Sequence, residues 1–463
     1  MNKKTEQDIM EKLVSLCKQR GFIFPSSEIY GGLQGFWDFG PLGVELKNNI
    51  KKSWWKRFVQ MRSDVVGLDS TIITNPTVWE KSGHIGGFSD KLVECKKCHH
   101  RFKADDFTSN AKCPDCKGEF TGERNFNTMF KTFVGPVENS STTAYLRPET
   151  AQNIFVNFDT VRAAMRTKIP FGIAQIGKSF RNEITPGNFI FRSREFEQME
   201  LEYFVNPKED KKWFEEWVNQ SMQWFIDLGI DKNNLRKYEQ KGKELAHYAK
   251  ETIDIEYNFP FSSHGACPPV LWHGRRGSAS GGDKGFAELM GISNRTDHDL
   301  KAHGFTYKDE VTKEEFIPYV IEPSVGVERA ALAFLLDAYT EIEGGRTTTT
   351  DSNKEKEVVL KLHKDLAPYK VAILPLSKKE NLTELALEIY DSLKSKHMVM
   401  YDQVASIGRR YRRQDEIGTP YCVTVDFDSL EDKAVTVRDR DTMEQERISI
   451  AELAKYINKK LES

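Results

Sequence analysis

The stretch GKSFRNEITPGNFIFRSREFEQMELEYF, residues 177–204, decides the fold because it predicts two paired strands. Its two apolar runs flank the turn sequence Thr-Pro-Gly-Asn, which favours an antiparallel hairpin. Side chains alternate between the two faces of a strand, so the second run turns Phe191, Met199 and Leu201 to one face. Its other face carries Arg192, Arg194, Phe196, Gln198 and Glu200. The matching face of the first run carries Gln175, Ser179, Arg181 and Glu183.

The charged face of this hairpin has two interpretations. A solvated sheet face with many salt bridges is the more common arrangement, but it leaves Phe196 among arginines with nothing to gain from water. A bound nucleotide explains the face better, because planar guanidinium groups bind phosphate and an aromatic ring stacks on a base. We therefore predict a nucleotide-binding site here.

The composition describes an ordinary globular protein with balanced charge. The chain has 463 residues, of which 39% are apolar and 29% charged, and its formal net charge is −2. No run approaches the ~18 apolar residues that a membrane helix needs, and the N-terminal MNKKTEQDIM lacks the apolar core of an export signal. Seven cysteines, four of them in two close pairs, fit a reducing cytoplasm better than a disulfide framework.

The patterns along the chain predict two large domains and a small insert. Apolar spacing predicts a first helix that ends at Gly21, a long helix with one apolar stripe over residues 44–58, and a helix in ERAALAFLLDAY. After the polar segment GGRTTTTDSNKEKE, strands alternate with helices. The expected ranges are 1–90 and 121–345 for an α+β core on an antiparallel sheet, 91–120 for the insert, 262–284 for an atypical loop insertion, 346–358 for a linker, and 359–463 for an α/β domain.

The insert contains two Cys-x-x-Cys pairs, Cys95/Cys98 and Cys113/Cys116, fourteen residues apart. This spacing is typical of a zinc ribbon, in which four thiolates close a tetrahedral structural site. Four free thiols are the alternative, and they require the pairing to be a coincidence. The neighbouring His99 and His100 are potential substitute ligands, although histidines at such a position are more often exposed to solvent.

A basic cluster lies in SIGRRYRRQDEIGTPYC, residues 406–422. Arginines around an aromatic residue suit single-stranded RNA, through phosphate contacts and base stacking. From composition alone a solvated charged face is the preferred interpretation.

Three segments resemble, in order, the signature motifs of the class II aminoacyl-tRNA synthetases. FRNE at 180–183 with Arg192 and Phe196 resembles motif 2, GVER at 326–329 resembles motif 3, and the long helix before TIITNP at 71–76 resembles motif 1. Longer phrases spread over nearly the whole chain are similar to the dimeric glycyl-tRNA synthetases of subgroup IIa. These phrases are GGLQGFWDFGPLGVELKNN, YLRPETAQ, QIGKSFRNEITPGNF, REFEQMELE, NRTDHDL, IEPSVG and IGRRYRRQDEIGTPYC.

The resemblance implies a class II catalytic core, an anticodon-binding domain and a homodimer. It implies that glycine and ATP form glycyl-adenylate, from which the glycyl group passes to the 3′ end of tRNA(Gly). Neither step needs a protein nucleophile, so positioning and charge neutralisation are expected to provide the catalysis. ATP with Mg²⁺ is the implied substrate complex, and Zn²⁺ is the implied structural metal. A pocket that excludes one methyl group would reject alanine without an editing domain.

The resemblance also assigns residues. The catalytic pair is Arg181, on the α-phosphate and the glycine carboxylate, and Arg329, on the far end of the triphosphate, while Phe196 stacks on adenine. The implied ATP contacts are Arg181, Asn182, Glu183, Phe191, Arg192, Ser193, Arg194, Glu195, Phe196, Glu288, Leu289, Gly326, Val327, Glu328 and Arg329, with Mg²⁺ at Glu288. The implied glycine contacts are Arg101, Glu149, Phe196, Glu197, Gln198, Met199, Glu200, Arg295, Glu322, Pro323, Ser324, Val325 and Gly326. The implied zinc ligands are Cys95, Cys98, Cys113 and Cys116, and the implied tRNA contacts are Arg409, Arg410, Arg412 and Arg413.

Two departures from the family pattern leave alternatives open. The insertion 262–284 interrupts the approach to Glu288, which puts the Mg²⁺ role of that residue in doubt, and His298 stands where an aromatic residue is usual. A catalytically silent, synthetase-like RNA-binding protein is one alternative. A synthetase of the same subgroup for another amino acid is the other.

Overall fold

The structure is a computed structural model that describes residues 3–104, 107, 111–139, 142–246, 248–261, 285–344 and 356–462. The expected loop insertion at 262–284 lies outside the described residues, and so do residues 346–355 of the expected linker. Within the described ranges, no helix combines the length and the apolar character needed to span a membrane.

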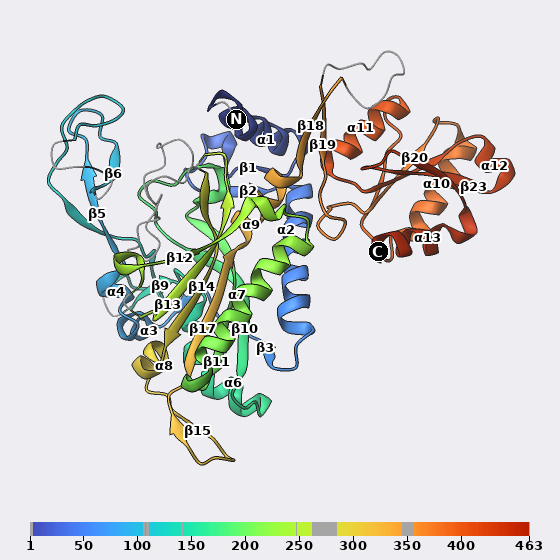
Figure 1. Ribbon diagram of the computed structural model, residues 1–463. Coiled ribbons are helices and arrows are strands. Elements are labelled where there is room, and N and C mark those ends of the chain that lie inside the picture. Colours follow the sequence, from blue (N-terminus) through green and yellow to red (C-terminus); the bar gives the residue numbers. More distant parts are fainter. Residues whose placement is uncertain are drawn as a thin grey trace.

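A seven-stranded sheet forms the centre of the large domain, as expected from the hairpin (Figure 1). All neighbouring strands are antiparallel except for the edge strand β3, which runs parallel to β10. In spatial order the strands are β12 (Leu235–Glu239), β13 (Glu251–Asn258), β14 (Phe286–Thr296), β17 (Tyr319–Gly326), β11 (Glu195–Val205), β10 (Phe171–Phe180) and β3 (Val65–Gly67).

Three helices cover one face of this sheet. Helices α7 (Asp210–Asp227) and α9 (Val327–Ala338) pack directly on the strands, and α2 (Pro41–Trp55) packs against α9. The apolar stripe expected at 44–58 is confirmed, because Leu46, Ile50, Trp54 and Phe58 are all buried in the main core. The odd-numbered side chains of β11, such as Met199 and Leu201, enter the same core. The even-numbered side chains of β11 are therefore left for the other face.

The remaining elements of the large domain surround the sheet. The first helix ends as expected, because Gly21 follows it with φ +75°, a conformation that favours glycine. These elements are α1 (Lys3–Arg20), β1 (Ile23–Pro25), η1 (Glu28–Tyr30), β2 (Trp37–Phe39), η2 (Lys56–Gln60), β4 (Ile73–Thr74), α3 (Pro76–Lys81), α4 (His84–Gly87), β8 (Lys131–Phe133), β9 (Thr143–Leu146), α5 (Ala151–Val156), α6 (Phe158–Met165), η5 (Phe189–Phe191), η6 (Pro207–Glu209), η7 (Lys232–Asn234), η8 (Gly242–Glu244), α8 (His298–His303), β15 (Tyr307–Lys308) and β16 (Glu315–Phe316).

The cysteine-bearing insert is a separate lobe that projects from the large domain (Figure 1). Its sheet has the order β6–β5–β7, with β5 at Ser89–Glu94, β6 at Arg101–Lys103 and β7 at Arg124–Asn127. The rings of Phe102, Phe107 and Phe120 form its small aromatic core. The lobe thus begins before residue 91 and ends after residue 120.

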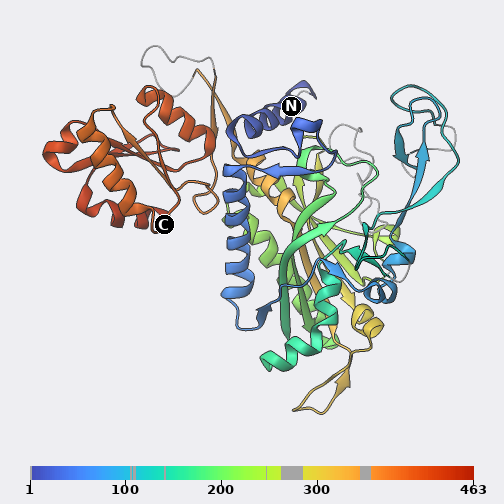
Figure 2. The same ribbon diagram turned by 180° about the vertical axis from the view of Figure 1, so that it is seen from behind.

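The C-terminal part forms a second lobe with its own core, visible from both sides (Figures 1 and 2). Its five-stranded sheet has the order β21–β20–β22–β23–β24, of which the first three strands are parallel, so the α/β expectation is confirmed. The elements are β20 (Val371–Pro375), α10 (Glu380–Leu393), β21 (Val399–Tyr401), α11 (Ile407–Ile417), β22 (Tyr421–Val425), α12 (Asp428–Asp432), β23 (Ala434–Asp439), β24 (Gln445–Ser449) and α13 (Ile450–Glu462).

The junction between the lobes differs from the expected linker. Strand β19 (Lys356–Leu360) pairs antiparallel with β18 (Tyr339–Glu343), so residues 356–358 belong to a strand. The apolar residues Val358, Val359 and Leu360 explain the difference, because Val359 and Leu360 are fully buried once paired.

Candidate functional site

The paired strands β10 and β11 set the geometry of the site. Their register places Ser179 opposite Phe196 and Gln175 opposite Glu200, so the polar face expected from alternation is formed. Strand β11 begins only at Glu195, however, and residues 181–194 form a long loop with the short helical turn η5. The alternation predicted Phe191, Arg192 and Arg194 on the strand, and this was wrong, because Pro186 and Gly187 open a loop far longer than a two-residue turn.

Buried polar contacts hold this loop. Arg192 donates to the Glu183 carboxylate from Nε at 2.9 Å and from Nη2 at 2.5 Å, and both residues are buried. The guanidinium of Arg194 donates to the backbone carbonyl of Glu183 at 3.0 and 2.8 Å. Asn182 donates its backbone N–H to the Thr128 carbonyl at 2.7 Å. The loop is therefore preorganised rather than free to swing.

Two arginines and two aromatic rings meet at the end of this face. The Cζ atom of Arg181 lies 5.5 Å from the centre of the Phe196 ring, and that of Arg329 lies 4.3 Å from the Phe191 ring. Arg329 comes from the first turn of α9, far along the chain, yet it lines the same cavity as Arg181, Phe196 and Arg192. Burial lowers the pKa of Arg181, while Glu149, Glu183 and Glu200 act in the opposite sense. The structure thus brings guanidinium groups and aromatic rings together, as the nucleotide interpretation requires.

Glu288 reaches this group from strand β14. Arg329 donates from Nη1 to the Glu288 backbone carbonyl at 3.0 Å and to its carboxylate at 3.3 Å. The carboxylate is partly exposed beside the cavity, and an oxygen ligand of this kind suits Mg²⁺, which binds through one or two carboxylates, waters and phosphates.

A cluster of buried carboxylates forms the second part of the site, and we call this cluster the carboxylate pocket. Glu149 from the segment before α5, Glu200 from β11 and Glu322 from β17 are all less than 9% exposed. Glu200 accepts hydrogen bonds from Thr150 N at 3.1 Å, from the Thr150 hydroxyl and from Ser324 Oγ at 2.8 Å. Burial raises the pKa of Glu200, and the nearby Glu149 raises it further. This pocket adjoins the arginine pair, since Glu149 and Glu200 both act on Arg181.

One arginine compensates part of this negative charge. Arg295 donates from Nη1 to both oxygens of Glu322 at 3.0 and 3.1 Å. Its Nε and Nη2 atoms donate to Asp299 at 2.7 and 2.9 Å. Four further residues adjoin this pocket but were not predicted as site residues: Asp299, Thr150, Gln152 and Glu202. For Glu202 the signal was available, because it continues the alternation of Gln198 and Glu200 along β11.

Several expected contacts point away from both pockets. Strand alternation turns Met199 and Val325 into the main core, and Leu289 and Val327 are buried there as well. Pro323 lies between Glu322 and Ser324 on β17 and so faces the other side of the sheet. Contacts of these residues with ATP or glycine would therefore be made by their backbone atoms, since their side chains face the core. Gly326 and Ser193, in contrast, line the arginine cavity.

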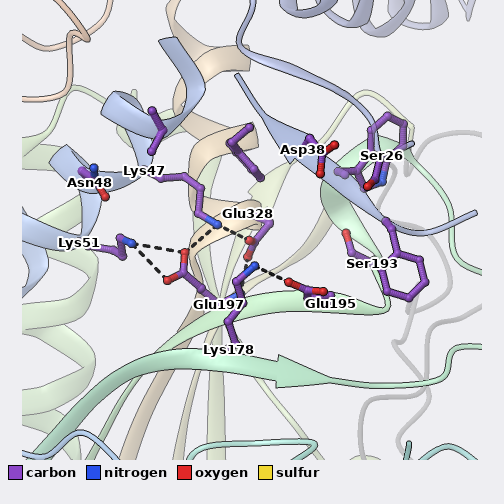
Figure 3. A pocket seen from close by; sticks show the side chains of 14 residues that line it. Ser26, Asp38, Lys47, Asn48, Lys51, Lys178, Ser193, Glu195, Glu197 and Glu328 are labelled. Atoms are coloured by element: carbon purple, nitrogen blue, oxygen red, sulfur yellow. Dashed lines mark hydrogen bonds and ion pairs between the residues drawn. The ribbon is translucent and has the colours of Figure 1, made fainter. Parts of the chain in front are cut away.

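Glu195 and Glu197 line a different cavity of about 370 Å³ on the back of β11, and Glu328 lines both this cavity and the arginine cavity (Figure 3). Lys47 from α2 lies there with its Nζ 2.7 Å from both Glu328 and Glu197 and 4.3 Å from the Phe39 ring centre. Glu328 also accepts the backbone N–H of Glu197 at 2.9 Å. Burial alone would lower the pKa of Lys47, but the two carboxylates outweigh it and hold this pKa above its usual value.

The contacts of Lys47 thus link Glu197, which follows Phe196 on β11, to Glu328, which precedes Arg329 on α9. We expect Lys47→Met to lower the free energy of unfolding by about 3 kcal/mol, because it leaves the buried Glu328 carboxylate without its cation and Glu197 with Lys51 alone. Chemical denaturation measures the loss. Lys51→Met is the matched control, since among the described residues Lys51 forms an ion pair with Glu197 alone and is more exposed, and its cost should stay below about 1 kcal/mol. Equal losses of unfolding free energy in both variants would contradict the proposed role of Lys47 as the cation shared by Glu197 and Glu328.

The four paired cysteines converge in the insert. Each offers a sulfur within 4.8 Å of the others, with 3.4 Å between Cys95 and Cys116 and 3.6 Å between Cys98 and Cys113. A tetrahedral zinc ion with Zn–S bonds of about 2.3 Å separates its sulfurs by about 3.8 Å, so the cluster fits zinc. His99 and His100 are exposed and pair with Glu94 and Asp115 instead. Arg101 is exposed on the same lobe and donates to Glu94 at 3.1 Å, away from the carboxylate pocket.

The arginine cluster forms helix α11, and its members differ in exposure. Arg410 is 2% exposed and donates to the backbone carbonyls of Pro375 at 2.5 Å and Asp402 at 3.1 Å. It was expected to contact tRNA, and its burial contradicts this, because the carbonyls that end β20 need donors. Arg412 lies beside Glu357 at 3.6 Å, and Arg413 contacts Asp402 at 2.5 Å. Arg409 is exposed.

The comparisons with known proteins agree with this arrangement. Residues 133–339 match the tRNA synthetase class II core domain (G, H, P, S and T), and residues 370–460 match the anticodon binding domain. The chain is 53% identical to a glycine–tRNA ligase of Alkaliphilus oremlandii, over 98% of both chains. It is 52% identical to the glycine–tRNA ligase of Thermobifida fusca, over 98% of this chain and 99% of that one.

Among solved structures, a prolyl-tRNA synthetase from Cryptosporidium parvum matches with a TM-score of 0.64 and 16% identity, covering 97% of this chain and 76% of that one. This likeness supports the fold. The sequence identity, the two matched domains and the arrangement of the arginine and carboxylate pockets lead to one conclusion: the chain belongs to the glycine–tRNA ligase family of class II aminoacyl-tRNA synthetases.

Proposed function

We propose that this protein activates glycine with ATP and transfers the glycyl group to the 3′ end of tRNA(Gly). One observation carries the proposal: Arg181 lies beside the Phe196 ring and within electrostatic reach of the buried carboxylates Glu149 and Glu200. A single guanidinium can therefore contact the α-phosphate of ATP and the carboxylate of glycine, the two groups that react. The chain is 53% and 52% identical to two glycine–tRNA ligases, which supports glycine as the amino acid.

ATP occupies the arginine cavity in this proposal. Adenine stacks on Phe196, Arg181 neutralises the α-phosphate, and Arg329 holds the far end of the triphosphate. The enclosed part of this cavity measures about 30 Å³, and the cavity opens to solvent. Mg²⁺ bound at Glu288 would supply positive charge to the phosphate oxygens. The protein contributes positioning and charge, and no side chain acts as a nucleophile.

Glycine occupies the carboxylate pocket. Glu149, Glu200, Glu322 and Asp299 together carry more negative charge than Arg295 and Arg181 can neutralise. The ammonium group of glycine supplies the missing positive charge. Walls this well buried leave little room for a side chain, which suits the smallest amino acid.

We also propose a structural Zn²⁺ on the four cysteines, a homodimer and a cytoplasmic location. The resemblance to dimeric glycyl-tRNA synthetases supports the dimer, together with exposed apolar side chains near the start of α2. These are Ile29, Tyr30, Leu33 and Val44. Arg101 contacts glycine in this proposal only if the zinc lobe moves toward the carboxylate pocket when substrates bind.

The C-terminal lobe contacts tRNA through its exposed surface in this proposal, and Arg409 is the member of the arginine cluster best placed to do so. Arg409→Ala should weaken tRNA binding and reduce the slope of log K against log salt by about 1, because one phosphate contact is lost. Filter binding at several salt concentrations measures this, while adenylate formation should not change. Arg447→Ala is the control, since Arg447 is engaged with Asp426 and Asp432 and should leave the slope unchanged. An unchanged slope for Arg409→Ala would exclude the contact.

The exchange of pyrophosphate into ATP tests the proposed function. We expect exchange that depends on glycine and needs no tRNA. A protein that binds tRNA(Gly) but shows no exchange with any amino acid would instead be a catalytically silent RNA-binding relative. Exchange stimulated more by alanine, serine, proline or threonine than by glycine would refute the assignment of the amino acid.

A further inference from the structure

Glu202 is a buried acid beneath the carboxylate pocket that none of the proposed steps uses. It lies on β11 two residues after Glu200, so both side chains share one face. The β11–β17 register pairs Glu200 with Ser324 and Tyr203 with Ile321, which places Glu202 across from Glu322. Oxygens of Glu200, Glu202 and Glu322 all lie within 4.8 Å of one another.

The surroundings of Glu202 do not support a negative charge. Its side chain is 0% exposed, and within the described part of the chain neither carboxyl oxygen receives a hydrogen bond. Its neighbour on β10 is Ile173, which is apolar. A buried carboxylate without hydrogen bonds is strongly disfavoured, and like charges directly opposite each other on a sheet repel.

Among the described residues, the charged groups that act most strongly on Glu202 come from four elements. They are Glu200 on β11, Glu322 on β17, Arg295 on β14 and Asp299 on α8. Arg295 is the only cation among them, and all three of its nitrogens already donate to Glu322 and Asp299. Of the three acids Glu200, Glu202 and Glu322, Glu202 is the one without donors, so it is the first to take a proton.

We infer that Glu202 is held as a neutral carboxylic acid and acts as a positioning residue, whose O–H donates to Glu322 and orients that carboxylate for the ammonium group of glycine. Burial, followed by repulsion from Glu322, raises the pKa of Glu202 well above its usual value, which agrees with the geometry. This inference rests on the proposed glycine activation. It extends it by assigning a role to a side chain that does not touch the substrate.

Two variants distinguish a neutral hydrogen-bond donor from an ionised carboxylate and from a side chain that only fills space. Glu202→Gln keeps the shape and a donor without a charge, so the KM for glycine in pyrophosphate exchange should stay within about twofold of the wild-type value. Glu202→Leu removes the donor, so this KM should rise about tenfold, the size expected for one lost hydrogen bond to a charged group. The KM for ATP should not change in either variant, because Glu202 adjoins the residues proposed to bind glycine and not those proposed to bind ATP.

Infrared spectroscopy reads the proton directly. The difference spectrum of wild type minus Glu202→Gln should contain the C=O stretch of a protonated carboxyl group, with or without glycine. Absence of this band, together with a large loss in Glu202→Gln, would mean that Glu202 is ionised and would overturn the inference. Wild-type KM values in both variants would also overturn it, by showing that the residue only fills space. If the wild type shows no glycine-dependent exchange, the proposed function fails, whereas the infrared band still decides the protonation of Glu202.

Discussion

Replacing Arg181 with alanine should abolish glycine-dependent exchange of pyrophosphate into ATP, with a loss of at least about 10²-fold. The guanidinium is 3% exposed, its Nε donates to the Pro148 carbonyl at 2.9 Å, and it stands beside Phe196. In the proposed complex it neutralises the phosphate on which charge develops as pyrophosphate leaves. Preorganised positive charge in a buried site contributes more than the same charge in water.

Two control variants test whether the shape of the Arg181 side chain and its position in the site matter. Arg181→Lys keeps the charge but loses the planar fork, so it should recover only part of the activity. Arg162→Ala removes an arginine of α6 that pairs with Asp159 on the surface, and it should exchange like the wild type. Binding of tRNA should be nearly unaffected in Arg181→Ala. Substantial remaining exchange in that variant, with an unchanged melting temperature, would refute the role of Arg181.

Replacing Cys113 with serine should lower the zinc content from one ion per chain to none. Cys113 is buried, and its sulfur lies 3.6 Å from that of Cys98 in a cluster that fits a tetrahedral ion. Within its described residues, the lobe adds only small buried apolar side chains such as Val93 and Ala104 to the three phenylalanine rings, so metal ligation should dominate its stability. Atomic absorption measures the metal, and limited proteolysis should cleave the lobe while the sheet domain remains intact.

Cys422→Ala is the control for this experiment. Cys422 is fully buried in the C-terminal sheet, where burial raises the pKa of its thiol, so it should not bind zinc. Its replacement should leave the zinc content unchanged. If Cys113→Ser retained one zinc ion per chain and resisted proteolysis, the four-cysteine site would be wrong.

Local patterns were sufficient for much of the fold. The apolar stripe from Leu46 to Phe58 predicted a buried helix, because helical spacing puts these residues on one side whatever they pack against. The alternation around Phe196 predicted a polar sheet face for the same reason. The loop between the strands was not predictable in this way, because its shape depends on the contact between Arg192 and Glu183 and on the packing of Phe191 beneath Arg329.

The sequence by itself determined the family, the antiparallel core, the paired cysteines and the identity of the arginines and carboxylates, since these follow from residue order and spacing. Only the tertiary structure decided which of those residues share a site. It turned Met199 and Val325 into the core, buried Arg410 under backbone carbonyls and placed Glu202 opposite Glu322. The physical reason is that burial and pairing depend on neighbours distant along the chain. Residue order identifies the side chains, but the pleat of the strand and its pairing with the neighbouring strand determine the face on which each side chain lies.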